Sequence, residues 1–351
     1  MKNSIRVRDW SVEKLVPVVP ERFKHLLPTV LMPERCEFTI DECSNAVANA
    51  IRRTVLCEMK VMYLTCDYED IITDDPHVIP EMIQKRIRMI PLLQSIPPST
   101  VFSLEYQNKT LLTDDVKTGL FVCKNNNTKY FNETTTLVSI AAGRSIRINN
   151  CRIASDFTYK DGLGMCSVAF NATSICLDQV PIDMYADMKK TLRIINETVE
   201  LNENHVVSDQ KPTNNEPNAN KTPQSTHIAD PKVWRIAFNT NGTLPSKEIV
   251  KQACSNIIER LKHVLSLLHT IVSNDNQYVL TIHGESHTIG NLLMKTTDEL
   301  YSDVEAVTYN CPNVERTAIV RIIYADDINT LYKNVIDHLI GTFDTIKSSI
   351  M

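Results

Sequence analysis

Two separate segments of the chain share one pattern of apolar and polar positions. Residues 38–54 read FTIDECSNAVANAIRRT, residues 280–296 read LTIHGESHTIGNLLMKT, and the two align without a gap. Each begins with the alternation of a strand, passes through a polar turn and continues with apolar residues at helical spacing. This internal repeat predicts that one strand–turn–helix unit occurs twice in the chain.

The two polar turns contain residues that favour the start of a helix. In the first copy, Asp41 and Ser44 offer side-chain oxygens to the free N–H groups of the helix that follows. In the second copy, Gly284 permits the turn, and Ser286 or Thr288 can cap the helix.

A second matching pair of segments closes each half of the chain. Residues 234–239 (WRIAFN) predict a strand, and after Asn241-Gly242 a sustained apolar stripe predicts a helix from about 246 to 271. Residues 317–324 (TAIVRIIY) predict another strand, and Asp326-Asp327 introduce another long apolar stripe. Both halves therefore follow the order strand, helix, strand, long helix, which predicts an α+β fold built from two similar units.

The first unit is interrupted, whereas the second is compact. Strand signals at 101–106, 137–142 and 166–170 predict a strand-rich inserted domain. Residues 202–231 are rich in Asn, Pro, Thr and Lys and contain hardly any large apolar side chains, which predicts a disordered loop. The predicted organisation is an N-terminal extension (1–32), a first dimerisation domain (33–57 and 176–272), the insertion (58–175) and a second dimerisation domain (278–351).

Each unit has long helices with a broad apolar face and only a small sheet for that face to cover. We therefore expect the two units to pack on each other about a pseudo-two-fold axis, as the subunits of a symmetric dimer do. The residues expected at this intramolecular interface are Val47, Ile51, Val55, Ile289, Leu292, Leu293, Leu339 and Phe343.

Composition excludes several classes of function. The 351 residues have a net charge of −5 and a pI near 6.0, which argues against a surface built mainly to hold nucleic-acid phosphates. The first 30 residues contain charges throughout, so no signal-peptide core is expected, and no run approaches the roughly 18 apolar residues of a membrane span. The ten cysteines are scattered and are expected to be free thiols of an intracellular protein.

Several of these segments resemble the alpha-like subunits of multisubunit RNA polymerases. The stretch ANAIRRTVLCEMKVMYL (48–64) is similar to the dimerisation-helix signature of the bacterial alpha subunit and of the third subunit of eukaryotic RNA polymerase II. IQKRIRMIPL (83–92) and WRIAFNTNGTLPSKEIVKQA (234–253) resemble further parts of that third subunit, and HGESHTIGNLL (283–293) resembles the signature of its partner, the eleventh subunit. Both signatures in one chain resemble the fused subunit of large DNA viruses of eukaryotes.

The resemblance implies a non-catalytic platform on which a DNA-directed RNA polymerase assembles. It implies contacts with the largest and second-largest polymerase subunits and with small assembly subunits, contact with DNA only through the complex, no membrane contact and no cofactor. Arg52 and Arg53 match an arginine pair expected to touch the second-largest subunit, and Lys85 and Arg86 lie in the other expected contact segment. A viral subunit of this kind is expected in the host cytoplasm, in the viral factory, and in the virion.

The chain departs from the family in two places. The eukaryotic third subunit has a cysteine cluster for zinc, but residues 67–122 here contain no cysteine, and Cys123, Cys151, Cys166 and Cys176 lack the short paired spacing of a zinc site. We therefore expect no structural zinc. The family's His-Arg-Ile-Gly sequence is replaced by the more basic sequence at 85–88.

Two other interpretations remain open at the level of sequence. The basic run 85–88 could serve a stand-alone nucleic-acid-binding regulator. His283 and His287 could belong to the metal site of an enzyme, although no third ligand is evident and Gly284 interrupts a common helical face. The chain has no GK[ST] phosphate-binding motif and no GxSxG motif, and the glycines at 162 and 164 match a dinucleotide loop poorly, so an enzyme is not expected.

Overall fold

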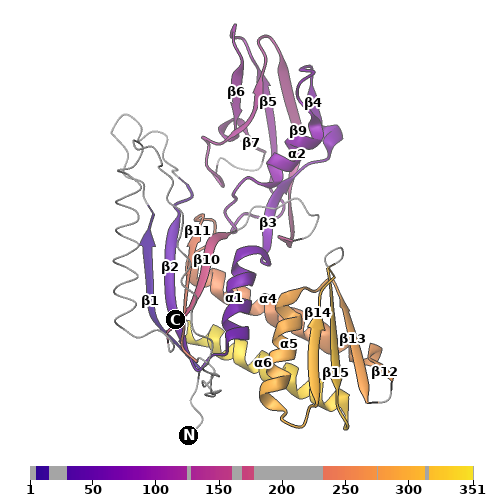
Figure 1. Ribbon diagram of the computed structural model, residues 1–351. Helices are drawn as coiled ribbons and strands as arrows, with labels where there is room; N and C mark the ends of the chain where they lie inside the picture. The colour runs from indigo at the N-terminus through magenta and orange to yellow at the C-terminus, as the bar shows by residue number, and fades with distance from the viewer. Residues whose placement is uncertain are drawn as a thin grey trace, which may run out of the picture.

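The computed structural model describes residues 5–15, 30–124, 128–159, 168–177, 232–274, 276–312 and 316–350. The loop predicted at 202–231, the glycine pair at 162 and 164, and Cys166 lie outside the described residues. The described elements form a mixed α+β structure (Figure 1).

The first half contributes a four-stranded antiparallel sheet with the order β1-β2-β11-β10. Its strands are β1 (Arg6–Lys14), β2 (Glu34–Asp41), β10 (Ala169–Cys176) and β11 (Trp234–Thr240), and its helices are α1 (Asn45–Cys57) and α4 (Ser246–Ser266). Phe38 and Ile40 of β2 and Ile236 and Phe238 of β11 are buried, as the alternating pattern of these two strands predicts.

The second half forms a sheet of the same size, with the order β12-β13-β15-β14. Its strands are β12 (Val272–Asn274), β13 (Gln277–His283), β14 (Ala306–Asn310) and β15 (Thr317–Ile323), and its helices are α5 (His287–Leu300) and α6 (Ile328–Ser349). The four helices of both halves lie between the two sheets (Figure 1). No helix in the described part of the chain combines the length and the apolar character that crossing a membrane requires.

The ends of the helices follow local sequence in part. The Ser44 hydroxyl accepts a hydrogen bond from the N–H of Val47, at 3.5 Å, and the Asp327 carboxylate accepts one from the N–H of Asn329, at 3.0 Å. Asp41 is the last residue of β2 and does not cap α1. Helix α4 ends at Ser266 rather than near 271, because the chain tightens into a 3-10 turn at Leu268–Thr270 before β12.

The segment between α1 and β10 has a hydrophobic cluster of its own, which includes Leu64, Ile87, Phe102, Ile140 and Ile148. Its elements are β3 (Lys60–Thr65), η2 (Tyr68–Asp70), β4 (Ile71–Thr73), α2 (Pro80–Arg88), β5 (Val101–Gln107), β6 (Asp114–Lys117), η3 (Thr118–Leu120), β7 (Val122–Cys123), β8 (Thr136–Ile140) and β9 (Ser145–Phe157). The sheet order is β3-β9-β5-β7, with β4 also on β9, and β6 pairs with β8. In Figure 1 this part stands above α1 and the first sheet.

Two segments lie in a different part of the fold from the one that the sequence predicted. The strand signal at 166–170 was assigned to the insertion, but the strand begins at Ala169 and pairs with β11 in the first sheet. Part of the N-terminal extension, β1, pairs with β2 in the same sheet. Both are edge strands, and their pairing is set by partners that are distant in the chain, which local pattern does not reveal.

Gly242 is required by the turn between β11 and α4. Its φ is +80°, and a Cβ placed on it would lie 2.3 Å from the carbonyl oxygen of Met32. Gly284 also has a positive φ, +82°, but a Cβ there would meet nothing within 4 Å. A side chain at Gly284 would cause only conformational strain, whereas a side chain at Gly242 would also clash with the backbone of Met32.

We expect Gly242→Ala to destabilise the protein by at least about 2 kcal/mol more than Gly284→Ala, because only the first also collides with main-chain atoms. Chemical denaturation of the two variants beside the wild type measures the difference. Equal losses of stability would contradict the close approach of Met32 to this turn.

Candidate functional site: the interface between the two halves

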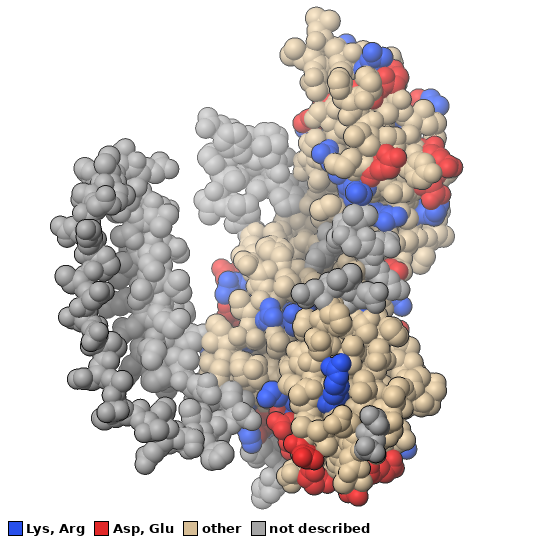
Figure 2. Space-filling model, turned by 45° about the vertical axis from the view of Figure 1, so that its right-hand side comes forward, with Lys and Arg blue, Asp and Glu red and all other residues tan. Residues whose placement is uncertain are grey.

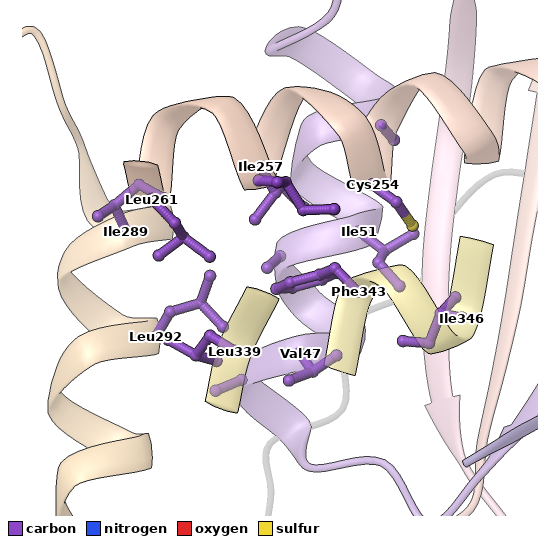
Figure 3. Close-up of a cluster of buried hydrophobic side chains, with 14 of the residues drawn as sticks. Val47, Ile51, Cys254, Ile257, Leu261, Ile289, Leu292, Leu339, Phe343 and Ile346 are labelled. Atoms are coloured by element: carbon purple, nitrogen blue, oxygen red, sulfur yellow. The ribbon is translucent and has the colours of Figure 1, made fainter. Parts of the chain in front are cut away.

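The apolar faces of α1, α4, α5 and α6 meet in one buried hydrophobic cluster. Figure 3 shows side chains from all four helices pointing into the shared space. The eight residues predicted for the interface all belong to this cluster, and none is more than 4% exposed: Val47, Ile51, Val55, Ile289, Leu292, Leu293, Leu339 and Phe343. Complete burial of a large aliphatic or aromatic side chain contributes about 1.5–3 kcal/mol, so this contact is a major source of stability.

At one edge of this hydrophobic cluster, three charged residues are also buried. Glu58 follows the last residue of α1, Arg260 lies on α4, and Glu285 lies in the turn before α5, and their exposed fractions are 1%, 4% and 4%. Arg260 Nη1 donates to Glu58 Oε2 at 2.5 Å, and Arg260 Nε lies 3.0 Å from both Oε1 and Oε2 of Glu285. Arg260 Nη2 also donates to Glu285. We call Glu58, Arg260 and Glu285 the buried charge cluster.

Hydroxyl groups from the second half complete the coordination of Glu58. Ser286 Oγ donates to Glu58 Oε1 at 3.0 Å, and Thr288 Oγ1 donates to the same oxygen at 2.9 Å. The prediction that one of these side chains caps α5 is therefore wrong: Ser286 occupies the N-cap position but makes no side-chain capping bond. Both hydroxyls are instead oriented toward the buried carboxylate of the first half, to which they donate charge-assisted hydrogen bonds.

Two further arginines border the buried charge cluster. Arg53 Nε donates to Thr288 Oγ1 at 3.0 Å, and its Nη2 lies 3.8 Å from Glu58 Oε1. Arg316 Nη2 lies 3.4 Å from the same oxygen, and the guanidinium carbon of Arg316 stacks 3.4 Å from the ring centroid of Tyr159. The buried charge cluster joins α1, α4 and the turn before α5. Through Arg316 and Tyr159 it also reaches the start of β15 and the segment that follows β9.

The surrounding groups keep both signs of charge in place. Burial alone raises the pKa of Glu58, but the attraction and hydrogen bond of Arg260, together with Arg316 and Thr288, outweigh it and hold that pKa below its usual value. Burial disfavours the charged form of Arg260, but its bonds to Glu285 and Glu58 raise its pKa. The arrangement is an ion cluster that binds parts of the chain together.

The predicted partner-binding residues occupy two separate places. Arg52 on α1 donates from Nε and Nη2 to Asn49 Oδ1, at 3.0 and 2.8 Å, and Arg53 is committed to the interface between the halves. On α2, Lys85 is exposed, and Arg86 Nη1 donates to the carbonyl oxygen of Leu137 at 2.8 Å. In Figure 2, basic and acidic residues are interspersed over the upper part of the face shown and form no continuous basic surface there.

The two histidines considered as metal ligands have other neighbours. His283 Nδ1 lies 3.3 Å from Thr317 Oγ1, and the His287 ring meets the edge of the Tyr309 ring. Glu285, between them in sequence, is held by Arg260. Across the residues that the structure describes, no three His, Cys, Asp or Glu side chains are grouped so as to hold a metal ion.

The buried charge cluster was missed at the level of sequence, although one signal was present. Arg260 occupies a buried position of α4 between the apolar residues Ile257 and Leu261. An arginine on the buried face of a helix requires buried acidic partners. The sequence does not reveal which carboxylates these are, because Glu58 and Glu285 come from elements far away along the chain.

Comparison with known proteins fits this architecture. The model of the RNA polymerase Rpb3/Rpb11 dimerisation domain matches residues 37–261, from β2 to the last part of α4. The chain belongs to this family. The resemblance found in the sequence is thereby confirmed, and the chain is a structural, non-catalytic type of DNA-directed RNA polymerase subunit.

The curated relatives are viral and fused. The chain is 26% identical over 300 residues to the DNA-directed RNA polymerase RPB3-11 homolog of African swine fever virus, isolate Tick/Malawi/Lil 20-1/1983, over 77% of this chain and 74% of the relative. It is 25% identical over 298 residues to the protein of the same description from isolate Pig/Kenya/KEN-50/1950, with the same coverage.

We expect Leu293→Asp to destabilise this Rpb3/Rpb11-type subunit by at least about 3 kcal/mol, because it removes apolar contacts and buries a carboxylate without a partner. Leu300→Asp, on the same helix at a position 44% exposed, is the matched control and is expected to change stability by less than about 0.5 kcal/mol. Denaturation curves compare the two variants. Similar small losses in both would contradict the burial of α5 in the shared cluster.

The depressed pKa of Glu58 predicts a dependence of stability on pH. The stabilisation is present above the unfolded-state pKa, about 4.3, and is lost as the pH falls through the lower folded-state value. Glu58→Gln is expected to cost about 2 kcal/mol at neutral pH and to flatten the decline of the thermal midpoint between about pH 5 and 3. Glu105→Gln alters an exposed carboxylate, so its thermal midpoint should fall with pH in parallel with that of the wild type. If the thermal midpoint of Glu58→Gln also fell in parallel with the wild type, Glu58 would not be a charged, stabilising group.

Proposed function

We propose that the chain is the assembly platform of a viral DNA-directed RNA polymerase, in which two dimerisation units of one polypeptide pair about a pseudo-two-fold axis. The first unit comprises β1, β2, α1, β10, β11 and α4, and it is opened after α1 by an inserted domain. The second unit comprises β12 to α6. Since β10 joins the first sheet, we place the end of the insertion near residue 168 rather than 175.

The observation that carries this proposal is the common topology of the two sheets. In β1-β2-β11-β10 and in β12-β13-β15-β14, the two central strands are each followed by a helix, and each central strand is flanked by the strand that precedes it in the chain. The helices of both units share one hydrophobic cluster. Two copies of one topology with a common core are what a duplicated dimerisation unit produces.

The connection between the units supports pairing within one chain. The short join at 272–277 forms the hairpin of β12 and β13, so the end of the first unit leads directly into the second sheet. Covalent linkage over so short a distance gives an effective concentration on the order of millimolar, which favours one-to-one pairing.

We further propose that α1 and α2 present the surfaces for the other polymerase subunits. The side chain of Arg52 on α1 is held by its hydrogen bonds to Asn49. Arg52 is our candidate for contact with the second-largest subunit. Arg53 remains a second candidate, although its bond to Thr288 gives it a role inside the fold. Lys85 and Arg86 on α2 are the candidates for the other polymerase subunits, the largest and the small assembly subunits among them.

We propose the host cytoplasm, including the viral factory, and the virion as the places where the protein acts, since the similar proteins are viral polymerase subunit homologs. Binding of DNA by the chain alone receives less support, since Arg86 and Arg88 of the basic run already bond Leu137 and Thr65 within the fold. Contact with DNA is proposed to occur only through the assembled complex.

Affinity purification of tagged full-length protein from infected cells tests the platform. The wild type should retain the two largest polymerase subunits, whereas Arg52→Glu should lose most of the second-largest subunit while its thermal midpoint stays near that of the wild type. Lys109→Glu, in the exposed loop between β5 and β6, is the charge-matched control and should retain both. Full retention by Arg52→Glu would remove this residue from the contact, and absence of both large subunits from the wild-type sample would overturn the platform.

A further inference from the structure

The buried charge cluster lies at one end of the helix interface, and its counterpart at the other end is different. In the gap-free alignment of the two units, Glu285 corresponds to Cys43, Ser286 to Ser44 and Thr288 to Ala46. Helix α4 begins at Ser246 and α6 at Ile328, so that Arg260 and Thr342 occupy the same position along equivalent helices. The acidic residue Glu285, the hydroxyl of Thr288 and the arginine are therefore each present in only one unit, whereas the serine is present in both.

The structure contains a small pocket at that equivalent end. Its volume is about 90 Å³, and its lining includes Cys43, Ser44, Val47 and Thr342. These are the residues that correspond to Glu285, Ser286, Ile289 and Arg260, so the pocket occupies the place that mirrors the buried charge cluster. The charged or titratable residues that also border it are Glu42, Glu299 and His338, and its lining in the described part of the chain includes no arginine or lysine.

We infer that the buried charge cluster makes the pairing directional: it selects the contact of a first unit with a second unit against the contact of two like units. This inference rests on the proposed pairing of the two units. Glu58 and Arg260 come from the first unit, and Glu285, Ser286 and Thr288 come from the second, so the complete set of bonds forms only across an unlike pair.

A pair of two first units or of two second units would leave some of these buried charges without their bonds. Two second units would bring Glu285 against the position of Thr342, which buries a carboxylate without a cation. Two first units would bring Arg260 against the position of Cys43, where the bonds of Nε and Nη2 to Glu285 have no replacement. Buried charges that lose a partner are strongly unfavourable, and specificity arises from such penalties on the wrong partner as much as from contacts with the right one.

The hydrophobic contacts cannot supply this discrimination. Val47 corresponds to Ile289 and Ile51 to Leu293, so the two units present aliphatic side chains of similar size. Such faces pack on one another in any combination with modest changes in energy. The positions where the units differ in charge are the positions able to distinguish them.

The test uses the full chain with a protease site placed in the 3-10 turn at Leu268–Thr270, between α4 and β12, and cut after purification. The nicked protein is dissociated in mild denaturant, allowed to reassociate by dilution, and analysed by native mass spectrometry. The wild type is expected to return as one-to-one pairs of the long and short fragments. The variant with Glu58→Met, Arg260→Met and Glu285→Met is expected to fold, because a buried ion cluster replaced as a whole by apolar residues retains stability, and to raise the fraction of like pairs about 10-fold or more.

The controls separate the possible outcomes. Arg52→Met removes an arginine that bonds Asn49 within α1 and is not among the buried residues of that helix, and it should leave the wild-type ratio unchanged. A triple variant that still returns only one-to-one pairs overturns the inference. If the fragments of the nicked wild type do not associate at all, the proposed pairing itself fails, which is a different result.

A second variant covers the case in which the triple variant does not fold. Glu285→Gln keeps the shape of the side chain and removes the charge that opposes pairing of two second units. It should increase pairs of short fragments over the wild type, and an unchanged ratio would overturn the inference. Arg260→Met alone removes the cation that Glu285 bonds and leaves Glu58 with only the more distant Arg53 and Arg316. It is expected to lower the thermal midpoint by about 5–10 °C, whereas the triple variant recovers most of that loss.

Discussion

The contact between two apolar helix faces is the constraint on which the rest of this structure depends. Among the described residues, each of the two similar units has one four-stranded sheet and two helices on its inner side, and a sheet of that size covers only one side of its helices. The opposite side would expose a large apolar surface to water if the half stood alone. Packing the two halves together buries both surfaces in one cluster, which explains why the units occur as a pair and why a short hairpin is sufficient to join them.

The insertion that we propose is compatible with this contact because of where the chain leaves α1 and where it returns. The chain departs after α1 at Glu58, and Thr158 returns beside the departure point, with its N–H bonded to the carbonyl of Met59 at 2.8 Å and its hydroxyl to that of Cys57 at 2.6 Å. The inserted segment therefore needs no displacement of the paired helices. The neighbouring Tyr159 stacks on Arg316 of the second half, so the buried charge cluster also lies where the insertion meets both units.

Sequence pattern was sufficient where a residue's environment is set by its own element. The strands and helices around Phe38, Ile51, Ile282 and Leu293 follow from alternation and helical spacing, and the structure places the interface residues predicted from them in one cluster. It failed where the partner lies far away in the chain: β10 is held by β11, and the hydroxyl of Ser286 bonds Glu58 instead of capping its own helix. The bond between Ser286 and Glu58 forms only when the two halves are brought together, so the sequence around Ser286 does not reveal it.

A duplicated unit that joins itself through aliphatic side chains has no inherent preference for one partner, since like and unlike pairs bury similar surfaces. Fusion into one polypeptide reduces the problem but leaves a newly made chain able to pair with another chain's equivalent half. In the pairing that we propose, charges on only one side of the pseudo-two-fold axis remove that ambiguity, because Glu285 and Arg260 satisfy each other only in the unlike arrangement. The burial of ions is a poor means of stabilising a core, so its presence at one end of this interface, opposite a small pocket at the other, is better explained by the need to define direction than by the need for stability.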